Sequence, residues 1–142
     1  MTIASLLAKK GPKVVTVQPE QTIRQALALL AEHNIGALVV VDPESRPIGI
    51  LSERDVVRAA VRDEAVFTKT VSALMTRDVI LGLPQDDLES VGRTMTDKRI
   101  RHLPVVDQRR LVGIISIGDV VKHRLGEMEH ESNALREYIL TA

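Results

Sequence analysis

The chain has 142 residues, of which 44% are hydrophobic and 27% are charged, and it contains no cysteine. A chain of this length fits one compact domain or two small, closely packed subdomains, and the lack of cysteine excludes disulfides, thiol catalysis and thiolate metal sites. Its 19 basic and 19 acidic side chains balance, so no net charge favours nucleic acid or an anionic membrane as a partner.

The first predicted elements form one β-α-β-β-α unit. A β-rich run at 13–17 precedes a helix that begins after Thr22, the first residue of a capping-box pattern. An apolar strand at 37–41, a polar turn and a second strand at 48–51 then predict a hairpin. The hairpin leads directly into a helix from Glu53 onward.

The same order of elements returns later in the chain. It consists of a β-rich run at 78–81, a helix capped by Asp87, strands at 103–106 and 111–115, and a helix from Ile117 onward.

The two units are copies of one repeat. An offset of 65 residues places Pro19 on Pro84, and after a one-residue gap in a polar turn an offset of 64 places 49–52 on 113–116. One unit of roughly 50 residues cannot bury both faces of its sheet, whereas two units can. The expected fold is therefore α/β (α+β), with two tandem β-α-β-β-α units packed face to face about a pseudo-twofold axis and a cleft between them.

The repeat divides the chain into four expected segments. They are a first domain at 1–64 that includes an N-terminal helix, a linker at 65–76 with a short helix, a second domain at 77–125, and a helical tail at 126–142. Gly126 is expected to kink or separate the tail.

Each unit places a glycine, a serine and an aspartate where its last strand meets the next helix, at 49–55 and 113–119. One interpretation is a capping box, in which Ser and Asp satisfy free amides of the first helical turn. The other is a ligand site, because a helix N-terminus attracts phosphate and a carboxylate binds the two hydroxyls of a ribose. The small glycine would let a base approach the backbone. Finding the pattern twice favours the ligand site.

These junctions, Gly-Ile-Leu-Ser-Glu-Arg-Asp and Gly-Ile-Ile-Ser-Ile-Gly-Asp, resemble the signature of cystathionine-β-synthase-type (CBS) domains. The runs at 74–76 and 101–107 are also typical of that family, and the resemblance covers about residues 2–125. It implies a stand-alone pair, without an enzyme domain, that senses adenosine ligands in clefts shared between the copies.

The resemblance also implies two sets of binding residues, whose aspartates hold the ribose and whose apolar side chains hold adenine. The first set is Ile50, Ser52 and Asp55 with Ile80, Ile100, Arg101 and His102. The second set is Ile114, Ser116 and Asp119 with Val15, Ile35 and Gly36.

The two expected sites differ in charge. Arg54, Arg101 and His102 are available for a phosphate in the first site, whereas the second has no equivalent cations. The first site should therefore bind a phosphorylated adenosine more tightly. Lys10 and Lys13 are the residues that could partly compensate in the second.

The expected function is a non-catalytic regulatory module that binds an adenosine ligand and signals to a partner protein. AMP is the expected ligand, with ADP, ATP, NAD and S-adenosylmethionine as alternatives that the sequence does not separate. The alternative function is a structural homodimerisation module without ligand-dependent regulation, and the orientation of the expected homodimer stays open.

Other function classes find no support in the sequence. There is no activated nucleophile, phosphate-binding glycine loop or metal-ligand cluster, so neither an enzyme, a catalytic cofactor nor a metal site is expected. Small basic clusters lack the stacking aromatics of nucleic-acid binders. No apolar run approaches a membrane span and the N-terminus lacks the charge order of a secretory signal, so we expect a cytoplasmic protein with no membrane partner.

Overall fold

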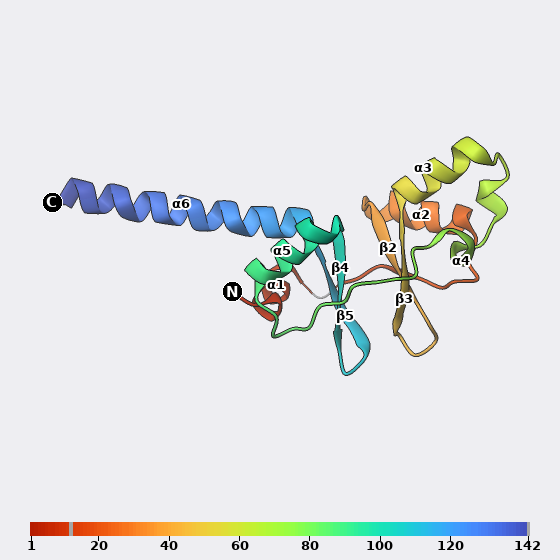
Figure 1. Cartoon of the computed structure of the whole chain (residues 1–142), viewed down its shortest axis with the longest axis horizontal. Helices are drawn as coiled ribbons and strands as arrows, with labels where there is room; N and C mark the ends of the chain where they lie inside the picture. Colours follow the sequence, from red (N-terminus) through yellow and green to blue (C-terminus); the bar gives the residue numbers. More distant parts are fainter. Residues whose placement is uncertain (12, 142) are drawn as a thin grey trace.

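Two similar halves lie side by side in the computed structural model, which describes residues 1–11 and 13–141 (Figure 1). The first half contains β1 (Thr16–Val17), α2 (Ile23–His33), β2 (Ala37–Val41), β3 (Pro47–Ser52) and α3 (Glu53–Arg62). The second half contains α5 (Leu88–Lys98), β4 (His102–Asp107), β5 (Arg110–Ser116) and α6 (Ile117–Thr141). The remaining helices are α1 (Ile3–Lys10), the 3-10 turn η1 (Val66–Thr68) and α4 (Val71–Leu74).

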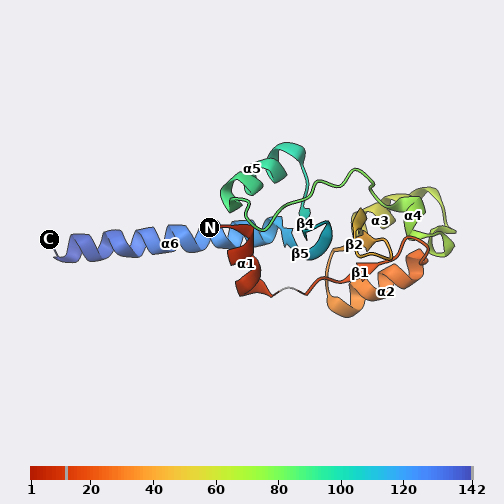
Figure 2. The same ribbon diagram turned by 90° about the horizontal axis from the view of Figure 1, so that it is seen from below.

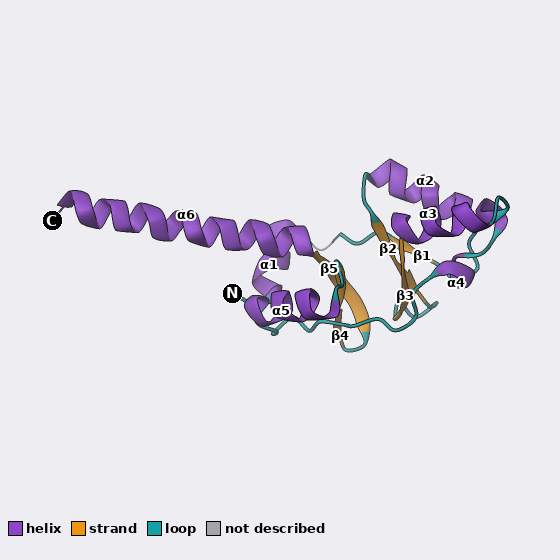
Figure 3. Ribbon diagram, turned by 45° about the horizontal axis from the view of Figure 1, so that its top comes forward, coloured by secondary structure: helices purple, strands orange, loops and turns teal. Residues whose placement is uncertain are grey.

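The first half is a three-stranded sheet in the order β1-β2-β3, with β1 parallel and β3 antiparallel to β2. All five residues of β2 are buried, as expected for a central strand covered on both faces. Helices α2 and α3 lie on one side of this sheet (Figure 3). Ile23, Ala26 and Leu30 of α2 pack with Leu38 and Leu51 of the sheet to form the first core.

The second half has a two-stranded sheet, and the predicted strand at 78–81 is not formed. A single parallel bridge between Gly82 and Val105 stands where β1 pairs with β2 in the first half, at Val17 and Val40. The first half has the corresponding strand, but only Thr16–Val17 of the predicted 13–17 is regular. Both β-rich runs therefore pair in parallel, but over fewer residues than their apolar patterns predicted.

Backbone hydrogen bonds confirm the repeat at atomic detail. Asn34 and Arg99 both end their helices in the left-handed conformation, with φ of 52° and 55°. The amide of Glu53 donates to the carbonyl of Gly36 over 2.9 Å, and in the second half the amide of Ile117 donates to that of Arg101 over 2.8 Å. The sequence offsets thus relate equivalent positions in space.

The two halves exchange the segments that precede them. The linker helix α4 packs on the first half, where the amide of Val71 donates to the carbonyl of Gln21 over 2.8 Å. Helix α1 makes the same bond on the second half, from the amide of Ile3 to the carbonyl of Asp86 over 3.0 Å. Figure 2 shows α1 beside the second half and α4 beside the first.

The exchange corrects the expected assignment of the N-terminal helix to the first domain. Ile3 is fully buried in the core of the second half, together with Met95, Leu103 and Ile115. Val71 occupies the equivalent place in the core of the first half. Neither core is complete without a segment that lies outside its own repeat unit.

The glycine of each junction has a different role from the expected one. A Cβ at Gly49 would lie 2.6 Å from Sδ of Met75 and 3.0 Å from the backbone oxygen of Thr76, and a Cβ at Gly113 would lie 2.7 Å from Leu7. The exchanged segments therefore cover both glycines. The glycines accommodate protein packing, and no base can approach the backbone on these faces.

Helix α6 continues without a break through Gly126 and projects beyond the second half (Figure 1). The expected kink or separation at Gly126 is therefore wrong, and the tail from 126 is the continuation of the last helix of the second half. No described helix combines the length and apolarity needed to cross a membrane.

Two glycine substitutions should have opposite effects on the free energy of unfolding. Gly126→Ala adds a Cβ where nothing lies within 4 Å, so it should stabilise α6 by about 0.5–1 kcal/mol through helix propensity. Gly49→Ala forces a contact with Met75 and the Thr76 backbone, so it should destabilise the chain by about 1–3 kcal/mol. Thermal unfolding followed by circular dichroism measures both; a neutral Gly49→Ala would contradict the described packing.

Candidate functional site

A cavity of about 300 Å³ opens between the two halves, at the end of β3 and the start of β4. It brings together all eight residues expected for the first site, including Arg54. The lining residues are Gly36, Ile50, Ser52, Glu53, Arg54, Asp55, Thr76, Asp78, Val79, Ile80, Arg99, Ile100, Arg101 and His102. A volume at the lower end of the usual range for ligand sites suits a small ligand.

Asp55 forms the capping box and still has a carboxylate oxygen available. Its Oδ2 accepts from the amide of Ser52 over 2.9 Å, and its own amide donates to Ser52 Oγ over 3.2 Å. Asp55 forms no ion pair with any residue of 1–11 or 13–141. The capping box and the ligand site are therefore compatible interpretations of the junction. The cap uses only Oδ2 of Asp55, and the residue still lines the cavity.

Three arginines surround the cavity: Arg54 from α3, Arg99 from the end of α5 and Arg101 just before β4. They are exposed, and within the described part of the chain they pair with no carboxylate. Arg99 was missed by sequence reasoning because its side chain comes from a helix end, not from a signature. Three unpaired guanidinium groups beside one cavity favour an anionic ligand group.

His102 faces the cavity as a neutral imidazole. Burial lowers its pKa below the usual 6.5, the nearby charges of Lys10 and Arg101 lower it further, and Asp119 only partly opposes them. At neutral pH the ring can donate a hydrogen bond but does not supply the positive charge expected from the sequence.

The second expected site is occupied by a lysine of the same chain. Lys10 Nζ contacts Asp119 Oδ2 over 2.5 Å and donates to the carbonyl of Ile114 over 2.9 Å. The capping box recurs, since Asp119 Oδ2 also accepts from the amide of Ser116 over 2.8 Å. Burial raises the pKa of Asp119, but the hydrogen bonds from Lys10 and Ser116 outweigh it and leave the pKa below its ordinary value.

The other three residues expected in the second site come from the first half. Gly36 lines the first cavity, where its carbonyl accepts from Glu53. Val15 and Ile35 pack, partly buried, against the core of the first half. The structure therefore brings the first expected set together in one cavity, whereas Gly36 of the second set lies at that same cavity.

The exchange of segments explains this difference between the sites. Leu7 covers Gly113 as Met75 covers Gly49, so α1 and the α4 segment follow equivalent paths. Three residues further along each path the chain has Lys10 in one half and Asp78 in the other. Lys10 pairs with Asp119, whereas Asp78 lines the first cavity and leaves Asp55 without a cation.

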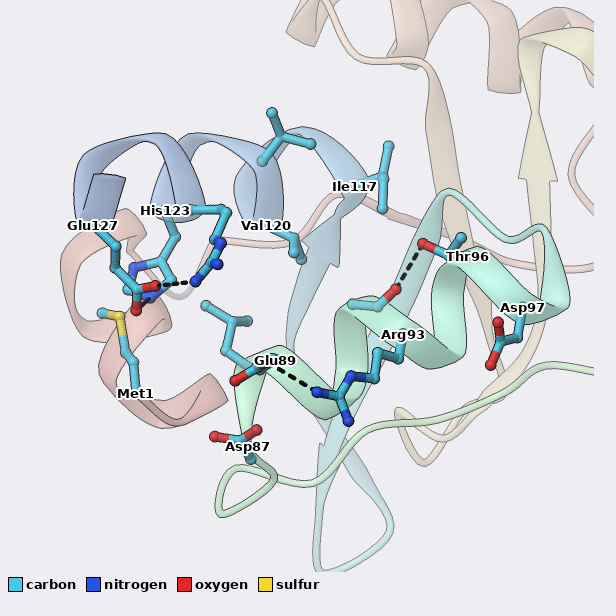
Figure 4. Close-up of a pocket in the computed structure, with 14 residues that line it drawn as sticks. Met1, Asp87, Glu89, Arg93, Thr96, Asp97, Ile117, Val120, His123 and Glu127 are labelled. Carbon is cyan, nitrogen blue, oxygen red and sulfur yellow. Dashed lines mark hydrogen bonds and ion pairs between the residues drawn. The ribbon is translucent and has the colours of Figure 1, made fainter. Parts of the chain in front are cut away.

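A second cavity, of about 460 Å³, lies between α5 and α6 (Figure 4). Gly92 lets the helices approach, because a Cβ there would lie 2.9 Å from Val120. Most of its charged lining side chains are paired: Glu127 contacts both His123 and Arg124, and Glu89 contacts Arg93. Of the other two, Asp87 caps α5 by accepting from the amide of Ser90, and Asp97 forms no ion pair with a described residue. This groove therefore has no unpaired cluster comparable to that of the first cavity, and the described residues hold no group of side chains suited to a metal ion.

Comparison with known proteins supports the repeat and its fold. The model of the CBS domain matches residues 9–62 and 71–126. The CBS domain-containing protein YhcV of Bacillus subtilis is 36% identical over 120 residues, which cover 84% of this chain and 83% of that protein. The crystal structure of the CBS-domain containing protein ATU1752 from Agrobacterium tumefaciens is 42% identical with a TM-score of 0.83, over 87% of this chain and 99% of that one.

A further solved structure is the CBS domain pair of protein MJ0100, in complex with 5′-methylthioadenosine and S-adenosyl-L-methionine. It is 28% identical to this chain, with a TM-score of 0.79 over 89% of this chain and 98% of that one. Two matched segments, the mirrored hydrogen bonds and these similarities agree, and the chain belongs to the CBS domain family as a tandem pair of CBS domains.

Proposed function

We propose that this CBS pair is a non-catalytic regulatory module that binds an adenosine ligand in the cavity at Asp55 and signals to a partner protein, in the cytoplasm. The observation that carries the proposal is one cavity lined by Asp55 and three arginines, none of which forms an ion pair within residues 1–11 and 13–141. The adenosine ligands named for MJ0100 support the same ligand class.

The cavity has a complementary group for each part of a nucleotide: ribose, phosphate and base. The free carboxylate oxygen of Asp55 can accept from the ribose hydroxyls, and the N-terminus of α3 and the arginines can bind a phosphate. The partly exposed side chains of Ile50, Ile80 and Ile100 provide an apolar surface for adenine.

AMP suits this cavity best among the adenosine ligands. A cluster of arginines favours a phosphate over the positively charged sulfonium of S-adenosylmethionine. The volume of about 300 Å³ favours one phosphate over the longer ADP, ATP or NAD. A ligand with about 23 non-hydrogen atoms gains roughly −0.3 kcal/mol per atom, which corresponds to a dissociation constant of about 10 μM.

A structural homodimerisation module is the second candidate. Val57 and Val61 on α3 are 63% and 84% exposed, and Val121 on α6 is 50% exposed, so helices of both halves present apolar side chains to solvent. The two candidates differ in one property, because only ligand sensing requires partner affinity to change when nucleotide binds.

Asp55→Ala should weaken AMP binding by about 10- to 150-fold, measured by isothermal titration calorimetry, since a charge-assisted hydrogen bond contributes roughly 1.5–3 kcal/mol. Asp119→Ala is the matched control, because it removes an equivalent helix cap from a site already filled by Lys10. Each variant should lose about 1 kcal/mol of stability from the cap. Equal losses of affinity in both variants, or no binding of any adenosine ligand by the parent chain, would refute the proposal.

Lys10→Ala should open the second site and raise the number of AMP molecules bound per chain from one to two. The substitution frees both Asp119 Oδ2 and the Ile114 carbonyl from the lysine. Lys13→Ala is the control, because Lys13 is an exposed lysine three residues away on the same segment. A stoichiometry of one in both variants would show that something other than Lys10 closes the second site.

The free energy of unfolding should decrease as the pH falls below about 6.5, in part because of His102. Its folded pKa lies below the unfolded value, so the unfolded chain binds the proton first and gains stability relative to the folded chain. His102→Gln should remove this part of the pH dependence, whereas the exposed His130→Gln should retain it. Urea denaturation between pH 7.5 and 5.5 measures the difference; identical pH profiles of His102→Gln and the parent chain would contradict it.

A further inference from the structure

The outer part of α6 lies in solvent, beyond the core of the second half. Ile117 and Val120 pack against that core, but every residue from Met128 to Leu140 is exposed. The helix extends away from both halves (Figure 1). A helix of this length without tertiary packing is only marginally stable in water. The apolar side chains on it therefore indicate that another surface packs against this part of α6.

These side chains follow the spacing of a coiled-coil seam. Steps of four and three residues lead along one face of α6, and five of the six positions are apolar and at least 50% exposed. The seam consists of Val121, Leu125, Met128, Ser132, Leu135 and Ile139. Alternate steps of four and three are the a and d positions of a heptad repeat. Tyr138 flanks the seam and Leu140 lies outside it.

The charges beside the seam fit a second copy of the same helix in parallel. In that orientation each g position faces the e position of the following heptad on the other helix. Arg124 then faces Glu129, and Glu131 faces Arg136, so both contacts join opposite charges and twofold symmetry repeats each of them. Arg124 also contacts Glu127 of its own helix through Nη1, which leaves its other guanidinium nitrogens to reach Glu129 of the second copy.

The antiparallel orientation gives the opposite result. With the seams fully overlapped, e positions face e positions and g positions face g positions. Glu129 then faces Glu129 of the second copy, Glu131 faces Glu131, and Lys122 faces Arg136, so these contacts join like charges. Charge complementarity therefore favours the parallel orientation of two copies of this chain over the antiparallel one.

We propose that two copies of the chain join through residues 121–139 of α6 in a parallel, in-register coiled coil. The twofold axis then runs along α6 and places the second half of one copy beside the second half of the other. The dimer orientation that the sequence left open is thereby assigned, and the assignment does not depend on nucleotide binding.

Disulfide trapping tests the proposal directly, because the chain has no cysteine of its own. Ile139→Cys places a thiol in the seam, where identical positions of the two copies meet, so mild oxidation should convert most of the chain to a covalent dimer. His130→Cys is the matched control, since it is equally exposed but on the outer face of the same helix, and it should stay mostly monomeric on a denaturing gel.

A charge exchange separates the two orientations. Glu131→Arg in the Ile139→Cys background should reduce trapping several-fold, because the introduced guanidinium meets Arg136 of the second copy, and adding Arg136→Glu should restore it. An antiparallel pair would instead trap Val121→Cys with Ile139→Cys and would not be rescued. Trapping of Val121→Cys with Ile139→Cys would overturn the proposal. Equal trapping at positions 130 and 139 would also overturn it, and so would an untrapped monomer whose α6 binds phosphatidylcholine vesicles.

Discussion

The structure depends on an exchange of segments between its halves: α1, which precedes the first half, packs on the second, and α4, which precedes the second half, packs on the first. Ile3 completes the second core and Val71 completes the first, each through a backbone bond at the equivalent position. A small sheet covered by helices on one face has too little buried area to be stable alone, and the exchanged segments supply part of the missing surface. Unfolding of one half therefore removes core residues from the other, which favours a single cooperative transition.

The same exchange determines why a symmetric backbone contains two unlike sites. Both aspartates receive the same cap from a serine amide, and both lie where a segment from the other side passes. One segment brings Lys10 and the other brings Asp78. A half-buried carboxylate with a lysine at contact distance already has its countercharge, whereas no cation of the described residues pairs with Asp55. The side chain that the passing segment brings to each aspartate therefore decides whether that aspartate is paired within the chain.

The local features were predictable from the sequence, and the non-local ones were not. The caps at Thr22, Asp87 and Ser52 and the two hairpins follow from short-range patterns, and the structure has all of them. The prediction of a strand at 78–81 was wrong because a parallel strand must pair with residues far along the chain. In this region only Gly82 makes such a pair among the described residues, with Val105. The exchange of α1 and the roles of Gly49 and Lys10 depend on which half a distant segment packs against, which no local pattern specifies. Within the candidate site, the repeat led us to expect Asp55 and Arg101 together, and both line one cavity, whereas Arg99 reaches that cavity from a helix end that no motif marks.

Backbone hydrogen bonds connect the cavity wall with α6, the helix that we propose for the coiled coil. Arg101 and His102 line the cavity, the carbonyl of Arg101 accepts from the amide of Ile117, and His102 pairs with Ser116 across the β4–β5 ladder. The first turn of α6 is therefore bonded to the cavity wall itself. A ligand that pulls Arg101 toward its phosphate would act on the base of the helix, and a coiled coil would transmit a change in the base as a change in the angle between two copies. Such a ligand would alter partner binding only to the extent that its affinity differs between the two angles of the coiled coil.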